Sequence, residues 1–243
     1  MTYYVPDTML QALIATEYYL PLFFQAVMGS SPSYSGVLIL PITLTQSTVG
    51  IITGIIIHRT GRYNELLLVG VVLLTLGCGL YVNLSPSSSL GEIVSFELIA
   101  GIGAGLLFSP PLVALQAMVS QKDTATATGT LGFVRNLATV LAVVIGGIMF
   151  QNTIGDEILK VEGLPANITA ALSGSSALAN IIVIDTIADA SQKFAVEQAV
   201  AFSLRNIWIM CVCMSACGMV ASIFIAKKEL SKTHEEAKTG LKN

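Results

Sequence analysis

The chain has 243 residues, of which 53% are apolar and only 11% are charged, whereas about 25% of the residues in an ordinary soluble domain are charged. With a mean hydropathy of +0.76, this composition excludes a soluble enzyme and a disordered chain. The net charge of -3 also excludes the basic surface that nucleic-acid binding requires. We therefore expect a lipid bilayer to surround most of this protein, and no nucleic-acid partner.

Long apolar windows predict the organisation of the chain. A bilayer core about 30 Å thick is crossed by about 20 mostly apolar helical residues. Residues 1–150 contain five such windows and residues 204–226 a sixth, which predicts an all-α membrane protein with six transmembrane helices. Between them, residues 151–203 form a long acidic connection, and residues 227–243 form a tail. The first five predicted spans are 8–28, 35–57, 66–84, 93–118 and 127–150.

The positions of Lys and Arg predict the orientation of these spans, because basic residues resist translocation. Most of them fall in the second and fourth connections and in the tail, so we expect both termini to be cytoplasmic. Residues 151–203 would then be extracellular or luminal. The sequon at Asn167 agrees, since N-glycosylation requires exposure on that side. A second sequon at Asn83 is close to the membrane, and we expect it to be unused.

Charged residues inside predicted spans are candidates for function, because burying a charge in lipid is costly. Glu17 in span 1 and Arg135 in span 5 are expected at the same depth, about 12 to 14 Å from the cytoplasmic side at 1.5 Å per residue. They could form a structural ion pair, Glu17 could exchange protons with a water-filled cavity, or the two could make no contact. Glu97 in span 4 is expected to be a solvated residue near the luminal end.

Uncharged polar and small residues in the spans have two readings. Amide side chains can bind a substrate in a cavity, but they also join helices to each other; these are Gln25, Gln46, Gln116 and Asn136. The pairs Gly50-xxx-Gly54 and Gly101-xxx-Gly105 predict close helix packing. No span carries a nucleophile with its base or a set of metal ligands, so we expect neither enzymatic activity nor a metal or cofactor.

The connection after span 2 carries a motif. Residues 54–62 read GIIIHRTGR, which resembles the GxxxDRxGR signature of the major facilitator superfamily. Gly54, Arg59, Gly61 and Arg62 match it, whereas His58 stands at the acidic position and is either a solvated turn residue or part of a gate. Four further stretches resemble the C-terminal half of a fungal fourteen-span drug:proton antiporter: EYYLPLFFQAV (17–27), AGIGAGLLFSPPLVALQAMV (100–119), TATATGTLGFVRNL (124–137) and SLRNIW (203–208).

The resemblance implies one six-helix half of a transporter, built as a three-plus-three inverted repeat. Spans 1, 2, 4 and 5 would line a cavity and spans 3 and 6 would face lipid. Glu17 would bind the proton, Arg135 would pair with it or contact substrate, and the four amide residues would line the cavity. The partners would be protons, small amphipathic substrates, and a missing N-terminal half or a second copy, in the plasma membrane rather than the vacuolar membrane. Alternatively, the chain is a truncated membrane protein that does not transport and acts only by pairing with another half.

Overall fold

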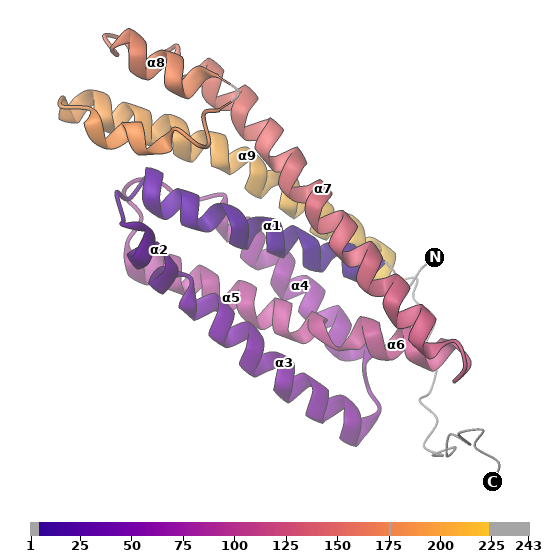
Figure 1. Ribbon diagram of the computed structural model, residues 1–243. Helices are drawn as coiled ribbons and strands as arrows, with labels where there is room; N and C mark the ends of the chain where they lie inside the picture. The colour runs from indigo at the N-terminus through magenta and orange to yellow at the C-terminus, as the bar shows by residue number, and fades with distance from the viewer. Residues whose placement is uncertain (1–4, 175, 224–243) are drawn as a thin grey trace.

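The computed structural model describes residues 5–174 and 176–223, which form a bundle of long helices joined by shorter ones (Figure 1). The six long helices are α1 (Val5–Ala26), α3 (Leu40–Thr60), α4 (Asn64–Tyr81), α5 (Leu90–Phe108), α7 (Thr124–Ile158) and α9 (Ala190–Ile223). The shorter ones are α2 (Pro32–Leu38), α6 (Pro110–Met118), α8 (Ala166–Ser173) and the 3-10 helix η2 (Ile181–Thr186).

Each predicted span coincides with a helix, although prolines divide two of the spans. Span 2 consists of α2 and α3, and span 4 breaks at Ser109, where Pro110 and Pro111 begin α6. Among the described residues, five helical segments are long and apolar enough to cross a membrane: Pro32–Thr60, Asn64–Tyr81, Leu90–Gln116, Thr124–Ile158 and Ala190–Val220. Helix α1 has 22 residues, which at 1.5 Å per residue are also long enough to cross a bilayer core about 30 Å thick. The all-helical membrane fold is confirmed.

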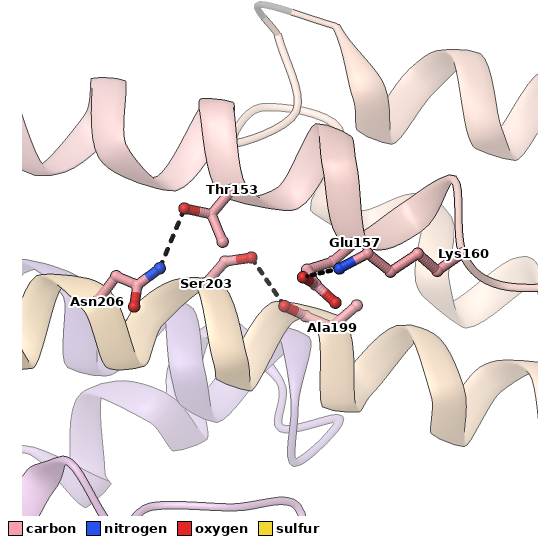
Figure 2. Close-up of polar contacts among 6 residues, drawn as sticks. All are labelled: Thr153, Glu157, Lys160, Ala199, Ser203 and Asn206. Carbon is pink, nitrogen blue, oxygen red and sulfur yellow. Dashed lines mark hydrogen bonds and ion pairs between the residues drawn. The ribbon is translucent and has the colours of Figure 1, made fainter.

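The helices on either side of the acidic connection are longer than predicted. Helix α7 continues past residue 150 to Ile158, and α9 begins at Ala190 rather than at residue 204. The added turns keep buried apolar residues four apart, Ile154 and Ile158 on α7 and Val196 and Val200 on α9. Polar contacts also join them: the Asn206 amide donates to Thr153 Oγ1 at 3.2 Å (Figure 2). Both helices thus extend beyond the predicted spans, and acidic residues in the added turns hide this helical periodicity in the sequence, while the predicted span boundaries at residues 150 and 204 stay a prediction.

The remainder of the connection also contributes to the core. Buried apolar side chains from α8 and η2 pack into the main apolar cluster of the bundle: Ile168, Leu172, Ile181 and Ile184. The Asn180 amide donates to the Ala171 carbonyl at 3.1 Å, which ties η2 to α8. In Figure 1 this segment lies at one end of the bundle, opposite the α3–α4 and α6–α7 connections. The predicted tail, residues 227–243, lies outside the described residues.

Small residues let α5 approach both α3 and α4 closely. A Cβ at Gly105 would lie 2.7 Å from the Gln46 carbonyl oxygen of α3, and a Cβ at Gly103 would lie 2.4 Å from the Leu74 nitrogen of α4. Gly101 likewise meets the Ile42 carbonyl oxygen, at 2.9 Å. The predicted packing role of Gly101-xxx-Gly105 is confirmed, whereas Cβ atoms at Gly50 and Gly54 would make only ordinary contacts.

The helix pairing relates the two halves of the chain. Helix α5, the first of the second triplet, packs against α3 and α4 of the first triplet. Helix α1, the first of the first triplet, packs against α7 and α9 of the second, and α4 and α9 contact each other. Each triplet therefore inserts its first helix between the other two helices of its counterpart. This exchange is the pairing expected of a three-plus-three inverted repeat.

Candidate transport site

The signature loop between α3 and α4 is a helix end that requires glycine. Gly61 has φ +71°, in the left-handed region, and its N–H donates to the Ile57 carbonyl at 2.8 Å. A residue with a Cβ is strained in this conformation. Glycine therefore ends α3 at Thr60 and turns the chain into α4.

The same loop packs against α6. Ile57 and Tyr63, on either side of the turn, form a small apolar cluster with Ala114 of α6. By contrast His58 and Arg59 are exposed, and Arg62 makes a surface ion pair with Glu65 at 3.9 Å. Such exposed pairs contribute little to stability. The loop is thus held by its apolar residues, and its charged residues face outward.

Glu17 lies half-buried on α1, at the level where α1 packs against α7. Two residues further along, the Tyr19 hydroxyl donates to the Val143 carbonyl of α7 at 2.6 Å. The Tyr19 ring also lies against Gly146, where a Cβ would come within 2.7 Å of the ring. These contacts fix the register of α1 on α7 and hence the level of Glu17.

Arg135 lies further toward the α6 end of α7 than the sequence suggested. Both α1 and α7 run from the α6 end toward the α8 end (Figure 1). Tyr19 is level with Val143, Glu17 lies two residues before Tyr19 and Arg135 eight before Val143. At 1.5 Å per residue, the backbones of Glu17 and Arg135 are offset by about 9 Å. The expected equal depth is therefore wrong, and a direct pair, which remains a prediction, would depend on the reach of the long arginine side chain.

The guanidinium of Arg135 lies over the Phe108 ring, 5.7 Å from its centroid. Phe108 is the last residue of α5, so this cation–π contact links α7 to the break between α5 and α6. Nearby, the Gln116 amide of α6 donates to Thr128 Oγ1 of α7 at 3.3 Å. Arg135 and Gln116 thus both contribute to the contact between α7 and the α5–α6 segment.

The other predicted amide residues are distributed over the bundle. Asn136 is exposed on α7, and Gln25 is half-buried near the end of α1. Gln46 on α3 has a buried Oε1 atom with no hydrogen-bond partner among the described residues. The predicted residues therefore fall into separate groups: Gln116 and Arg135 beside α6, Glu17 in the middle of α1, and Gln25 and Gln46 apart from both.

Glu97 corrects a sequence interpretation. Instead of being a solvated helix end, its side chain is fully buried, at 0% exposure, and neither carboxyl oxygen has a hydrogen-bond partner among the described residues. Position along the helix suggested solvation, but the helical face decides the outcome. Glu97 shares its face with Ala100 and Ala104, which are three and seven residues on and are both fully buried. This helical spacing was the signal in the sequence that could have indicated the burial of Glu97.

Comparison with known proteins places this bundle in a family. The sequence profile of the Major Facilitator Superfamily matches residues 8–155, more than half of the chain. The chain belongs to the Major Facilitator Superfamily. Members of this superfamily are transporters and generally not enzymes. This major facilitator chain is accordingly an integral membrane protein with several membrane-spanning helices.

Similar curated proteins are fungal. The chain is 37% identical to the MFS-type transporter ppz2 of Metarhizium majus over 95% of its length, which covers 40% of that relative. It is 38% identical to the efflux pump dotC of Dothistroma septosporum, over 94% of the chain and 39% of the relative. It is 31% identical to the MFS-type efflux pump LUC4 of a Fusarium species, over 86% of the chain and 37% of the relative. This major facilitator chain thus spans about two fifths of the relatives it matches.

Proposed function

We propose that the chain is the C-terminal six-helix half of a proton-coupled efflux transporter that exports small amphipathic compounds. The observation that carries the proposal is its similarity, over nearly its whole length, to proteins named as efflux pumps. Both termini would be cytoplasmic, in the plasma membrane. Spans 1, 2, 4 and 5 would line the cavity, Glu17 would bind the proton, and Arg135 and the amide residues would contact cargo.

The uncovered faces of two helices support a role as one half of a larger assembly. Helix α3 exposes Leu44 (61%) and Ile51 (67%), and α7 exposes Phe133 (66%). Small polar side chains lie among these apolar ones on both helices: Thr43, Ser47, Thr130 and Asn136 are exposed. The hydroxyls of Thr43, Ser47 and Thr130 donate to carbonyls four residues earlier in the chain, so the support comes mainly from the Asn136 amide, which is costly to expose to lipid. A second half would cover these faces and enclose a cavity with mixed polar and apolar walls.

Reconstitution tests whether the chain needs a partner. The chain would be placed in proteoliposomes, alone and together with the N-terminal part of the dotC efflux pump, and efflux of a fluorescent amphipathic dye driven by a proton gradient would be measured. Flux only with the added part supports the proposal, and flux by the chain alone would indicate a pair of identical copies. Absence of flux in both samples would favour the alternative, a membrane protein that pairs without transporting.

Glu17→Gln tests the proton-binding role within the reconstituted pair. The substitution preserves the size of the side chain but removes its titratable group, so proton-driven flux should fall to the level of protein-free vesicles while flux down a dye gradient persists. The matched control is Glu92→Gln, which removes a carboxyl from the first turn of α5. Unchanged proton-driven flux in Glu17→Gln would remove Glu17 from the mechanism.

A further inference from the structure

Glu97 is a carboxyl buried in the interior without a partner. It has 0% exposure, and both of its oxygens lack hydrogen-bond partners among the described residues. A carboxylate removed from water without compensation costs several kcal/mol, and a protein retains ionisable groups inside a membrane mainly where they function. Binding of a proton removes the charge and with it most of this cost. Glu97 therefore has the environment of a group that takes up protons.

The register between α4 and α5 places Tyr81 beside Glu97. Gly77 lies against Ala100 and Leu74 against Gly103, so the two helices run antiparallel. Tyr81 is four residues beyond Gly77, and Glu97 is three residues before Ala100. At 1.5 Å per residue, their backbones are level to within about 2 Å.

Tyr81 completes an isolated polar pair. Its side chain has 0% exposure, and its hydroxyl lacks a partner among the described residues. Glu97 acts on it electrostatically. Trp208 of α9 packs against the Tyr81 ring, with 5.8 Å between the ring centroids and 43° between the ring planes. A phenol and a carboxyl are thus enclosed together in an apolar surrounding.

Two of the helices that pack against α5 place an ionisable side chain near Glu97. From α1 the facing ionisable group is Glu17, and from α4 it is Tyr81. Helix α3 packs against α5 in the parallel direction, with Gly101 at Ile42 and Gly105 at Gln46. Its ionisable residues, His58 and Arg59, therefore lie roughly 25 Å or more from the level of Glu97. Helix α6 carries no ionisable residue.

A solvent-accessible pocket begins one residue beyond Tyr81. Its volume is about 360 Å³, and polar residues from the α4–α5 connection and from α9 line it together with Val82: Asn83, Ser85, Gln198 and Arg205. Val82, which follows directly on α4, lines the pocket, and this end of α4 is the one nearer to α8 (Figure 1). Neither Tyr81 nor Glu97 lines the pocket, but Tyr81 is the residue directly before Val82.

We propose that Glu97 is a proton-binding carboxyl of this chain, served from the pocket beyond Tyr81. The carboxylate accepts a proton from hydronium in the pocket, which leaves neutral Glu97 and a water molecule. Neither the Tyr81 hydroxyl nor the Glu97 carboxyl has a hydrogen-bond partner among the described residues, so a hydrogen bond from that hydroxyl to the charged carboxylate requires a movement of the two side chains. The inference rests on the proposed function in that proton binding serves transport, but proton binding itself is measurable without transport.

Infrared difference spectroscopy of the 243-residue chain in lipid vesicles tests the proposal. Between acid and alkaline buffers, a protonated carboxyl in an apolar site gives a C=O stretching band at higher frequency than a solvated carboxyl. We expect Glu97→Gln to lose this band, whereas Glu97→Asp and the control Glu92→Gln keep it. Glu17→Gln should keep the band, because the band arises from Glu97. An unchanged high-frequency band in Glu97→Gln would overturn the proposal.

A second measurement separates this inference from the proposed function. Circular dichroism of each variant shows whether it is folded. If Glu97→Gln does not fold, Glu97→Asp replaces it in the comparison, because this variant keeps a carboxyl but moves it by one methylene group. Loss of the band in Glu97→Gln without any proton-driven flux by the wild-type pair would support proton binding and contradict the proposed transport. Proton-driven flux by wild type with an unchanged band and unchanged flux in Glu97→Gln would contradict the inference and leave the proposed function intact.

Discussion

Gly103 illustrates how a single missing side chain determines the distance between two helices. Its nearest neighbours beyond its own helix are backbone atoms of α4, with the Leu74 nitrogen 2.4 Å from an ideal Cβ position. Backbone cannot rotate away as a side chain can, so an added methyl group must push the two helices apart. The side chains buried along α4 and α5 would lose contacts together.

Gly103→Ala should therefore destabilise the bundle by about 1 to 3 kcal/mol, the usual cost of overpacking. The matched control is Gly132→Ala on α7, where a Cβ would meet nothing within 4 Å. There alanine should stabilise the helix by up to about 1 kcal/mol. Thermal unfolding of the purified proteins in detergent measures both, and equal midpoints for the two variants would contradict this account.

For single residues, the sequence predicted the roles that depend on spacing along one helix. It missed the roles that depend on which other helix packs against the residue. Gly101 and Gly105 have the small-xxx-small spacing, and they do approach α3 closely. Glu97 was expected in solvent because it lies near a helix end. Its spacing from Ala100 and Ala104 indicates the face that it shares with them, but a single sequence does not specify that α4 packs against this face and buries the side chain. The proton-binding role of Glu17 remains a prediction.

Among the helices, the contact between α1 and α7 depends on one hydroxyl. Tyr19 donates to the Val143 carbonyl, which already accepts within α7 as part of a helix, so the phenol adds a second bond. The neighbouring Tyr18 is 60% exposed, and its ring meets that of Tyr19 edge to face. Substitution by phenylalanine keeps both rings and removes one hydroxyl at a time.

Tyr19→Phe should lower the free energy of unfolding by about 1 kcal/mol, the typical contribution of a hydrogen bond between membrane helices. Tyr18→Phe, the control, should leave it nearly unchanged because its hydroxyl is expected to be solvated. The measurement is again the unfolding midpoint in detergent. A larger loss for Tyr18→Phe than for Tyr19→Phe would show that the register of α1 depends on other contacts.

Helix existence was predicted well and helix length poorly. Apolar runs about 20 residues long indicated every long helix, because the length of a span is set by the thickness of the bilayer. The same criterion ended α7 near residue 150 and began α9 near residue 204. Both helices in fact extend toward the α8 end, where Ile158 and Val196 are buried among residues that read as polar overall.

For the whole molecule, glycosylation tests the orientation in the membrane. Asn167 is exposed at the second residue of α8, at the end of the bundle opposite the signature loop (Figure 1). If that end is luminal during synthesis, expression in a fungal host should attach a glycan there, which enzymatic deglycosylation removes with a shift in gel mobility. Asn167→Gln should abolish the shift and Asn83→Gln should preserve it. If neither residue carried a glycan, the Lys and Arg distribution alone would support the predicted orientation. A mobility shift lost only in Asn83→Gln would contradict the expectation that Asn167 is glycosylated and Asn83 is not.

The fold as a whole was predicted from the sequence through a short loop motif and the number of spans. The Gly54–Arg62 motif indicated the superfamily, and the profile match over residues 8–155 bears this out. The exchanged packing of α1 and α5 agrees with the inverted repeat that the resemblance implies. Cargo and ion coupling remain proposals, because the chain spans only about two fifths of the relatives it matches.

The position of α1 has a consequence for biogenesis. This helix is packed among α7 and α9, which begin roughly a hundred residues or more after α1 ends. It carries Glu17, a charged group that is costly to leave unpacked in lipid. We therefore expect α1 to leave the insertion machinery only after α7 and α9 have been made. Among the described helices, the contact between α1 and α9 would then be the last to form.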